Sequence, residues 1–211
     1  MKKSILALCA LTVAAGLSAC GGGTSSYAIG GVVAGLQYPG LVLQNNLAND
    51  LPVTPLGADT NGNIQNVTYT FPNEVDYGET YSVTVKTNPQ HQTCANSSGT
   101  SDTAGRLSSI NAVIVCSLVT NTIGGTITGL AADGLVLTNG SAGGTVTATK
   151  DATSGAYPTT FTFPVSVTYG QTYGVTVLTQ PTGQTCSVAN GAGTMDDNKV
   201  ETIAVTCRNN S

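Results

Sequence analysis

The chain has 211 residues, of which only 9% are charged, and its formal net charge is −4. So few charges, combined with 26 glycines and abundant threonine, serine and asparagine, are unusual for a cytosolic enzyme and typical of exported β-proteins. The negative charge also argues against nucleic acid as a partner, because an acidic surface repels phosphate backbones.

Residues 1–19 have the three parts of a secretory signal peptide. Lys2 and Lys3 come first, an apolar run from Ile5 to Gly16 follows, and small residues precede a processing site. The apolar run is too short to remain as a transmembrane helix. Cleavage would remove both lysines and leave 5 basic against 11 acidic residues, a net charge of about −6.

The four residues that end at Cys20 resemble the lipobox of bacterial lipoproteins. They read Leu17-Ser18-Ala19-Cys20. The resemblance implies that Cys20 is acylated after cleavage and anchors the chain in a membrane, where two or more acyl chains hold a protein stably. In that family an aspartate after the cysteine retains the protein in the inner membrane. Because Gly21 stands here, the resemblance implies the outer membrane, facing the periplasm or the exterior. An ordinary signal peptide cut after Ala19 is the alternative.

The mature chain divides into a tether and two repeats. Residues 20–28 are rich in glycine and serine, so we predict a flexible tether there. Residues 77–94 and 169–186 are identical at 12 of 18 positions. We therefore assign a first repeat to residues 29–118 and a second to residues 119–211. The segment between them is too short for free tumbling, which predicts a semi-rigid rod.

Each repeat consists of short β-rich runs separated by turn residues. Residues 81–86 and 173–178 alternate between apolar and polar, as strands with one buried face do. Pro52 and Pro55 mark one run of the first repeat as an edge strand or an irregular strand. Six or seven such strands in each repeat predict an all-β fold of two tandem immunoglobulin-like β-sandwich domains. A small Greek-key barrel is the alternative.

Four cysteines remain in the repeats at matching places. They are Cys94 and Cys116 in the first copy, and Cys186 and Cys207 in the second. Of the three possible connectivities, only pairing within each copy respects the duplication. An exported protein meets an oxidising environment, so we predict two structural disulfides. A zinc site or redox pair is the alternative, but no Cys-x-x-Cys motif occurs and the chain has one histidine.

The repeat resembles one found in uncharacterised proteobacterial surface proteins and lipoproteins. The shared motifs of the second copy lie at residues 134–139, 160–163, 173–186 and 190–194. The first copy departs at Asn88, where the pattern has glutamine. No catalytic or binding residue is assigned in these repeats, so the resemblance implies no activity.

Few residues suit catalysis. A Ser-His-acid triad needs a histidine held by an acid, and we expect the only histidine, His91, to be a solvated turn residue. Adjacent carboxylates could act on glycosidic bonds, and two such pairs occur: Glu74 with Asp76, and Asp196 with Asp197. Neither pair recurs in the other copy or lies in an apolar stretch. We therefore predict no enzyme, no catalytic residue and no cofactor.

One turn is a weak candidate for a metal site. Asp59, Asn61 and Asn63 offer oxygen atoms around a glycine turn, and calcium prefers oxygen ligands. The bidentate glutamate of a calcium loop is missing at the required spacing. Aspartate and asparagine also favour such turns without any metal, because they bond to their own backbone.

Tyrosines could bind sugars or partner proteins. Two tyrosine positions recur in both copies, which favours a structural role. Tyr77 matches Tyr169, and Tyr81 matches Tyr173. Three do not recur and could line a binding edge: Tyr27, Tyr38 and Tyr157.

The sequence thus predicts a membrane-anchored cell-envelope lipoprotein with a structural or protein-interaction role. Its partner would be an unknown envelope or extracellular protein or glycan. The alternative is a carbohydrate-binding or adhesive surface module, with calcium as a stabiliser; a small hydrolase is disfavoured by the single histidine. We expect function where the copies differ: the insertion at residues 47–63, the His91 turn, and the Asp196-Asp197 loop.

Overall fold

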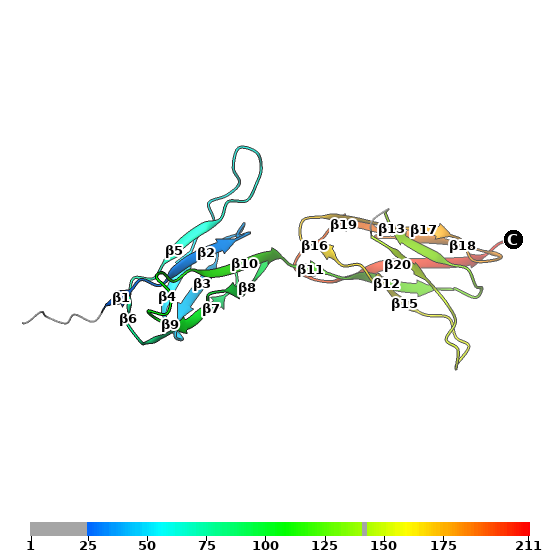
Figure 1. Ribbon diagram of the computed structural model, residues 1–211. Helices are drawn as coiled ribbons and strands as arrows, with labels where there is room; N and C mark the ends of the chain where they lie inside the picture. Colours follow the sequence, from blue (N-terminus) through cyan, green and yellow to red (C-terminus); the bar gives the residue numbers. More distant parts are fainter. Residues whose placement is uncertain (1–24, 141–142) are drawn as a thin grey trace, which may run out of the picture.

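The computed structural model describes residues 25–140 and 143–211. These residues form β-strands and no helix, which confirms the prediction of an all-β fold. Figure 1 shows two strand-rich bodies arranged end to end, with the first repeat in blue to green and the second in green to red. The predicted signal peptide and Cys20 lie outside the described residues. In the part that is described, no helix could cross a membrane.

The first repeat is an immunoglobulin-like β-sandwich. Its strands are β1 (Ser26–Tyr27), β2 (Gly30–Ala34), β3 (Leu41–Asn45), β4 (Ala48–Val53), β5 (Val67–Thr70), β6 (Val75–Asp76), β7 (Thr80–Thr87), β8 (Gln92–Ser98), β9 (Ser101–Thr103) and β10 (Ala112–Leu118). One sheet has the order β5-β2-β10-β8 and the other has the order β4-β3-β7-β9, while β1 pairs with β6. β2 and β10 run parallel. β4 lies at a sheet edge, as its proline predicts.

The second repeat reproduces this topology strand for strand. Its strands are β11 (Thr120–Asn121), β12 (Ile123–Thr128), β13 (Val136–Asn139), β14 (Thr145–Thr147), β15 (Thr160–Thr162), β16 (Val167–Thr168), β17 (Thr172–Thr179), β18 (Gln184–Ala189), β19 (Ala192–Thr194) and β20 (Val200–Asn209). The sheet orders are β15-β12-β20-β18 and β14-β13-β17-β19, and β11 pairs with β16. Each repeat has more strands than the six or seven predicted. The additional strands are two or three residues long, too short to leave an alternating pattern in the sequence.

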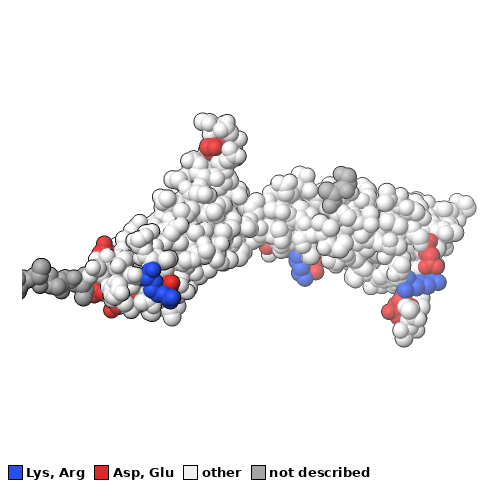
Figure 2. Space-filling view, viewed as in Figure 1, with Lys and Arg blue, Asp and Glu red and all other residues white. Residues whose placement is uncertain are grey.

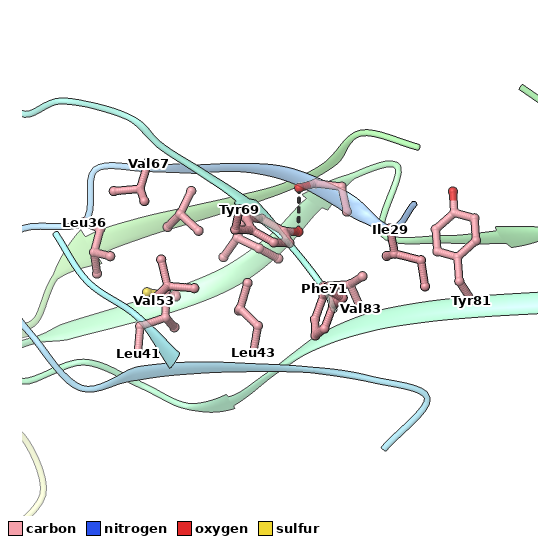
Figure 3. Packing of buried hydrophobic residues seen from close by; sticks show 14 of the residues in the cluster. Ile29, Leu36, Leu41, Leu43, Val53, Val67, Tyr69, Phe71, Tyr81 and Val83 are labelled. Atoms are coloured by element: carbon pink, nitrogen blue, oxygen red, sulfur yellow. Dashed lines mark hydrogen bonds between the residues drawn. The ribbon is translucent and has the colours of Figure 1, made fainter. Parts of the chain in front are cut away.

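Each repeat has its own hydrophobic core between its two sheets. Val33 and Ile114 on one sheet of the first repeat face Leu43 and Val83 on the other, and all four are fully buried. Figure 3 shows Leu43 and Val83 packing toward Tyr69 and Phe71. The second core draws only on residues from Ile123 onward. The two cores share no residue, so either repeat can lose stability without the other.

Both predicted disulfides are present. Cys94 is bonded to Cys116, and Cys186 is bonded to Cys207. Each bond joins directly opposed residues of neighbouring strands, β8 with β10 and β18 with β20. The disulfides therefore fasten strands within one sheet rather than linking the two sheets of a sandwich.

The first folded residues begin earlier than the sequence suggests. Residues 20–28 were assigned to a flexible tether, but Ser26 pairs with Asp76 and Tyr27 pairs with Val75 in the β1–β6 ladder. The Ser26 hydroxyl also donates a hydrogen bond to Glu74. Small polar residues can form such an edge ladder because backbone groups supply its bonds. The tether therefore ends before Ser25.

Candidate functional site at the domain junction

The connection between the repeats is fixed by backbone hydrogen bonds from both sides. The Val119 N–H donates to the His91 carbonyl of the first repeat at 2.9 Å, and the Val119 carbonyl accepts from the Tyr169 N–H of the second repeat at 2.9 Å. The next two residues form β11, which pairs with β16. The linker is thus bonded to both domains rather than free between them.

His91 is not the solvated turn residue that the sequence predicts. Its ring stacks on Tyr169 of the second repeat, with 4.0 Å between centroids and 10° between planes. Its Nδ1 lies 2.8 Å from Oδ2 of Asp197, and Tyr38 approaches edge-on at 4.8 Å. The His91 side chain is only 25% exposed. We call Tyr38, His91, Tyr169 and Asp197 the junction cluster.

The backbone at His91 adopts a conformation that favours glycine. Its φ is +58°, in the left-handed region, and the matching residue of the second repeat is Gly183 with φ +70°. Glycine adopts this conformation freely, whereas a residue with a Cβ is strained by it. The strain at His91 is offset by contacts with Tyr169 and Asp197, which Gly183 has no side chain to make.

A buried amide places Tyr38 beside His91. Gln92, which is 3% exposed, accepts hydrogen bonds from the backbone N–H groups of Gln37 and Tyr38 at 2.8 and 3.1 Å. Its Nε2 donates to the Gly35 carbonyl at 2.7 Å. Gln184 makes equivalent bonds in the second repeat. A buried amide is stable only when its donors and acceptors are satisfied, which explains why a glutamine recurs two residues before Cys94 and Cys186.

The electrostatics of the junction follow from partial burial beside carboxylates. Desolvation raises the pKa of the Tyr169 phenol, and Tyr38, Asp197 and Asp196 add to that rise. Tyr169 therefore stays neutral at ordinary pH. A protonated His91 would pair with Asp197 across the two domains. Charged pairs at such partly exposed sites contribute little by themselves, so the stacked rings supply much of the contact.

The junction cluster contains only part of a catalytic triad. His91 and Asp197 form a pair that resembles its base and acid. Tyr169 covers one face of the ring, and no described hydroxyl or thiol hydrogen-bonds to the ring nitrogens. The other paired carboxylates lie elsewhere: Glu74 accepts from Ser26, and Asp76 lies in β6. The acidic pairs considered for glycosidic chemistry therefore have separate structural contacts.

The proposed calcium turn uses its aspartate to hold itself together. Asp59 Oδ1 accepts from the N–H groups of Asn61 and Asn63, both at 2.8 Å, and Oδ2 accepts from Asn63 Nδ2 at 3.2 Å. These bonds lower the pKa of Asp59, the Asn63 N–H having the largest effect. Asn61 and Asn63 thus turn donors, not oxygen ligands, toward the carboxylate. Among the residues described, no group of three or more His, Cys, Asp or Glu side chains is placed to hold a metal ion.

The three unshared tyrosines lie in three different places. Tyr38 belongs to the junction cluster. Tyr27 lies in β1 and packs against the first core. Lys150 Nζ stands 4.8 Å above the ring of Tyr157. They do not form one binding edge.

Two of the three unshared features meet at the junction although they are 106 residues apart. His91 comes from the turn between β7 and β8, and Asp197 comes from the loop after β19. The shared Tyr169 is their common partner, which sequence reasoning missed because recurrence suggested a role within one domain. No protein-family model matches this chain, and no curated protein matches it either.

Proposed function

We propose that the protein is a lipid-anchored, non-catalytic rod of the cell envelope, which holds interaction surfaces at a fixed distance from the outer membrane. The observation that carries this proposal is the junction cluster. A residue under backbone strain is kept at the end of one sandwich for contacts with the next. Such a contact is useful where the relative position of two domains matters.

The composition and the cross-links support a place outside the cytosol. Disulfides persist in oxidising compartments, and each repeat contains one. Figure 2 shows large surface areas without charged side chains on the face in view. A surface of small polar side chains is common in exported β-proteins and supports export by the predicted signal peptide.

The loop at residues 54–66 is the surface that we propose contacts a partner. It projects from the side of the first sandwich in Figure 1. Ala58 and Ile64 form a bridge across it, and Asp59 closes its tip. Leu56 within it is largely exposed. The second repeat has a corresponding loop at residues 148–159, whose tip Asp151 closes in the same way, so the insertion expected from the sequence is not unique to the first repeat. Leu56 distinguishes the first loop, because no exposed large hydrophobic residue is found among residues 148–159.

The predicted lipid anchor lies directly before the first sandwich in the sequence. In a lipobox the cysteine carries the acyl chains, so Cys20 would hold the chain just before the first sandwich begins at Ser25. Replacing Cys20 with serine is expected to move the protein from the membrane fraction to the soluble fraction, because no acyl chain remains. Cell fractionation and immunoblotting measure this directly.

Cys9→Ser is the matched control, because Cys9 lies in the predicted signal peptide and would be absent from the mature protein. This variant should stay in the membrane fraction. If Cys20→Ser also stays there, the lipid anchor and the proposed function are wrong.

A further inference from the structure

The first sandwich begins in the same way as the second. In the second, the Tyr169 N–H donates to the Val119 carbonyl at 2.9 Å. In the first, the Tyr77 N–H donates to the Ser25 carbonyl at 2.8 Å. The β1–β6 pair likewise matches the β11–β16 pair. The surface of the second sandwich that contacts the first sandwich thus has an equivalent on the first sandwich, at the end where the chain enters it.

The same equivalence extends to the loop that follows β9 and β19. Gly78 donates to the carbonyl of Ala104, as Gly170 donates to the carbonyl of Met195. Two residues beyond these acceptors stand Arg106 in the first repeat and Asp197 in the second. Arg106 therefore occupies the position from which Asp197 contacts His91.

The counterpart in the first sandwich is uncovered. Tyr77 is 66% exposed and Leu107 is 61% exposed, whereas the equivalent Tyr169 is covered by His91. The Tyr77 ring lies against Gly105, since a Cβ on that glycine would come within 2.3 Å of Tyr77 Cδ2. We call Tyr77, Gly105, Arg106 and Leu107 the basal surface. Two of its side chains, Tyr77 and Leu107, are exposed hydrophobics, and no domain among the described residues covers them.

The short segment between Cys20 and Ser25 limits what can cover the basal surface. Only residues 21–24 separate Cys20 from Ser25, and the five extended Cα–Cα steps from Cys20 to Ser25 span at most about 18 Å. This is less than the thickness of a bilayer. A lipid on Cys20 therefore brings the basal surface to the membrane, just as the linker brings Tyr169 to the first sandwich.

We propose that the basal surface rests on lipid headgroups, so that the rod stands on the membrane. This inference depends on the proposed lipid anchor. Tyrosine suits the interface between headgroups and acyl chains, because its apolar ring enters while its hydroxyl stays wet, and leucine adds apolar area beside it. Arg106 pairs with Asp102 at 3.1 Å and is largely exposed, so its stem can lie along the same interface.

Charge near the basal surface selects the kind of lipid. Glu74, Asp76 and Glu79 lie on or next to the β6–β7 turn that carries Tyr77. Figure 2 shows acidic side chains at this end of the first sandwich. Carboxylates are repelled by anionic headgroups and attracted by ammonium groups. The surface therefore suits zwitterionic phosphatidylethanolamine better than anionic phosphatidylglycerol.

A single tryptophan can report on this contact, because the natural chain has none. The full lipidated protein carrying Leu107→Trp is reconstituted into phosphatidylethanolamine and phosphatidylcholine vesicles with brominated acyl chains. Bromine quenches tryptophan only at close range, so we expect loss of most of the emission and a blue shift. Leu178→Trp is the control, because Leu178 in β17 of the second sandwich is 60% exposed and should be neither quenched nor shifted.

The outcomes separate the inference from the anchor. If the protein floats with the vesicles and Leu107→Trp is quenched no more than Leu178→Trp, the basal surface does not touch lipid and the inference is overturned. If the protein does not float, the lipid anchor is wrong and both proposals fall. Partial replacement of the ethanolamine lipid by phosphatidylglycerol should weaken the quenching, and unchanged quenching would overturn the choice of lipid. Tyr77→Trp tests the same surface should Leu107→Trp fail to fold.

Discussion

Replacing Cys94 and Cys116 with alanine is expected to destabilise the first repeat by about 3 kcal/mol, which is the chain-entropy estimate for a loop of roughly twenty residues. The second repeat should be unaffected, because the two cores share no residue. For a domain of this size the loss corresponds to a fall in Tm of roughly 12–24 °C.

Differential scanning calorimetry of the soluble Cys20→Ser protein would show this as two separated transitions. The matched variant, Cys186→Ala with Cys207→Ala, should lower the other transition instead. A single transition that shifts equally in both variants would mean that the repeats unfold as one unit, contrary to their separate cores.

Gly125→Ala is expected to destabilise the second repeat by about 3 kcal/mol, the upper end of the usual cost of overpacking. A Cβ on Gly125 would lie 1.8 Å from the carbonyl oxygen of Ile203 in the neighbouring strand β20. Backbone cannot move aside as a flexible side chain does, so β12 and β20 would have to separate. Gly31 meets the Ala112 carbonyl in the same way at 1.9 Å.

Gly174→Ala is the control for this substitution. Gly174 lies in β17, and a Cβ there meets nothing within 4 Å. Its effect should stay within about 0.5 kcal/mol, or be slightly stabilising because alanine restricts the unfolded chain. Urea unfolding followed by tyrosine fluorescence compares the two variants. Similar stabilities would show that the sheet tolerates a side chain at Gly125.

The sequence predicted those parts of the fold that leave a periodic or duplicated pattern. Val83 and Val175 are buried as alternation requires, and Cys94 faces Cys116 as the duplication requires. Each repeat opens with two glycines, and the second of them, Gly31 or Gly125, lies against a backbone carbonyl of the neighbouring strand. No local sequence pattern reveals this close approach. Short strands such as β1 also escaped prediction, because two residues cannot show alternation.

The junction cluster could not be predicted, because it depends on how two domains meet. His91 looked solvated since its neighbours are turn residues, and its partner Asp197 is far away in the sequence. A hint was nevertheless present: a histidine stood where the other copy has glycine. A side chain at a position that favours glycine has a steric cost, and a compensating contact is the reasonable expectation.

Small-angle X-ray scattering of the soluble Cys20→Ser protein tests most directly whether the two sandwiches form one rod. The native junction should give a profile that fits the single extended arrangement of Figure 1. Tyr38→Ala with His91→Gly introduces the residues found at the matching positions of the second repeat, Ala132 and Gly183, so each sandwich should still fold. The variant should need a range of bent arrangements with a smaller average dimension. If the native protein already needs such a range, or the variant scatters identically, the junction cluster does not fix the domains and the proposed rod is wrong.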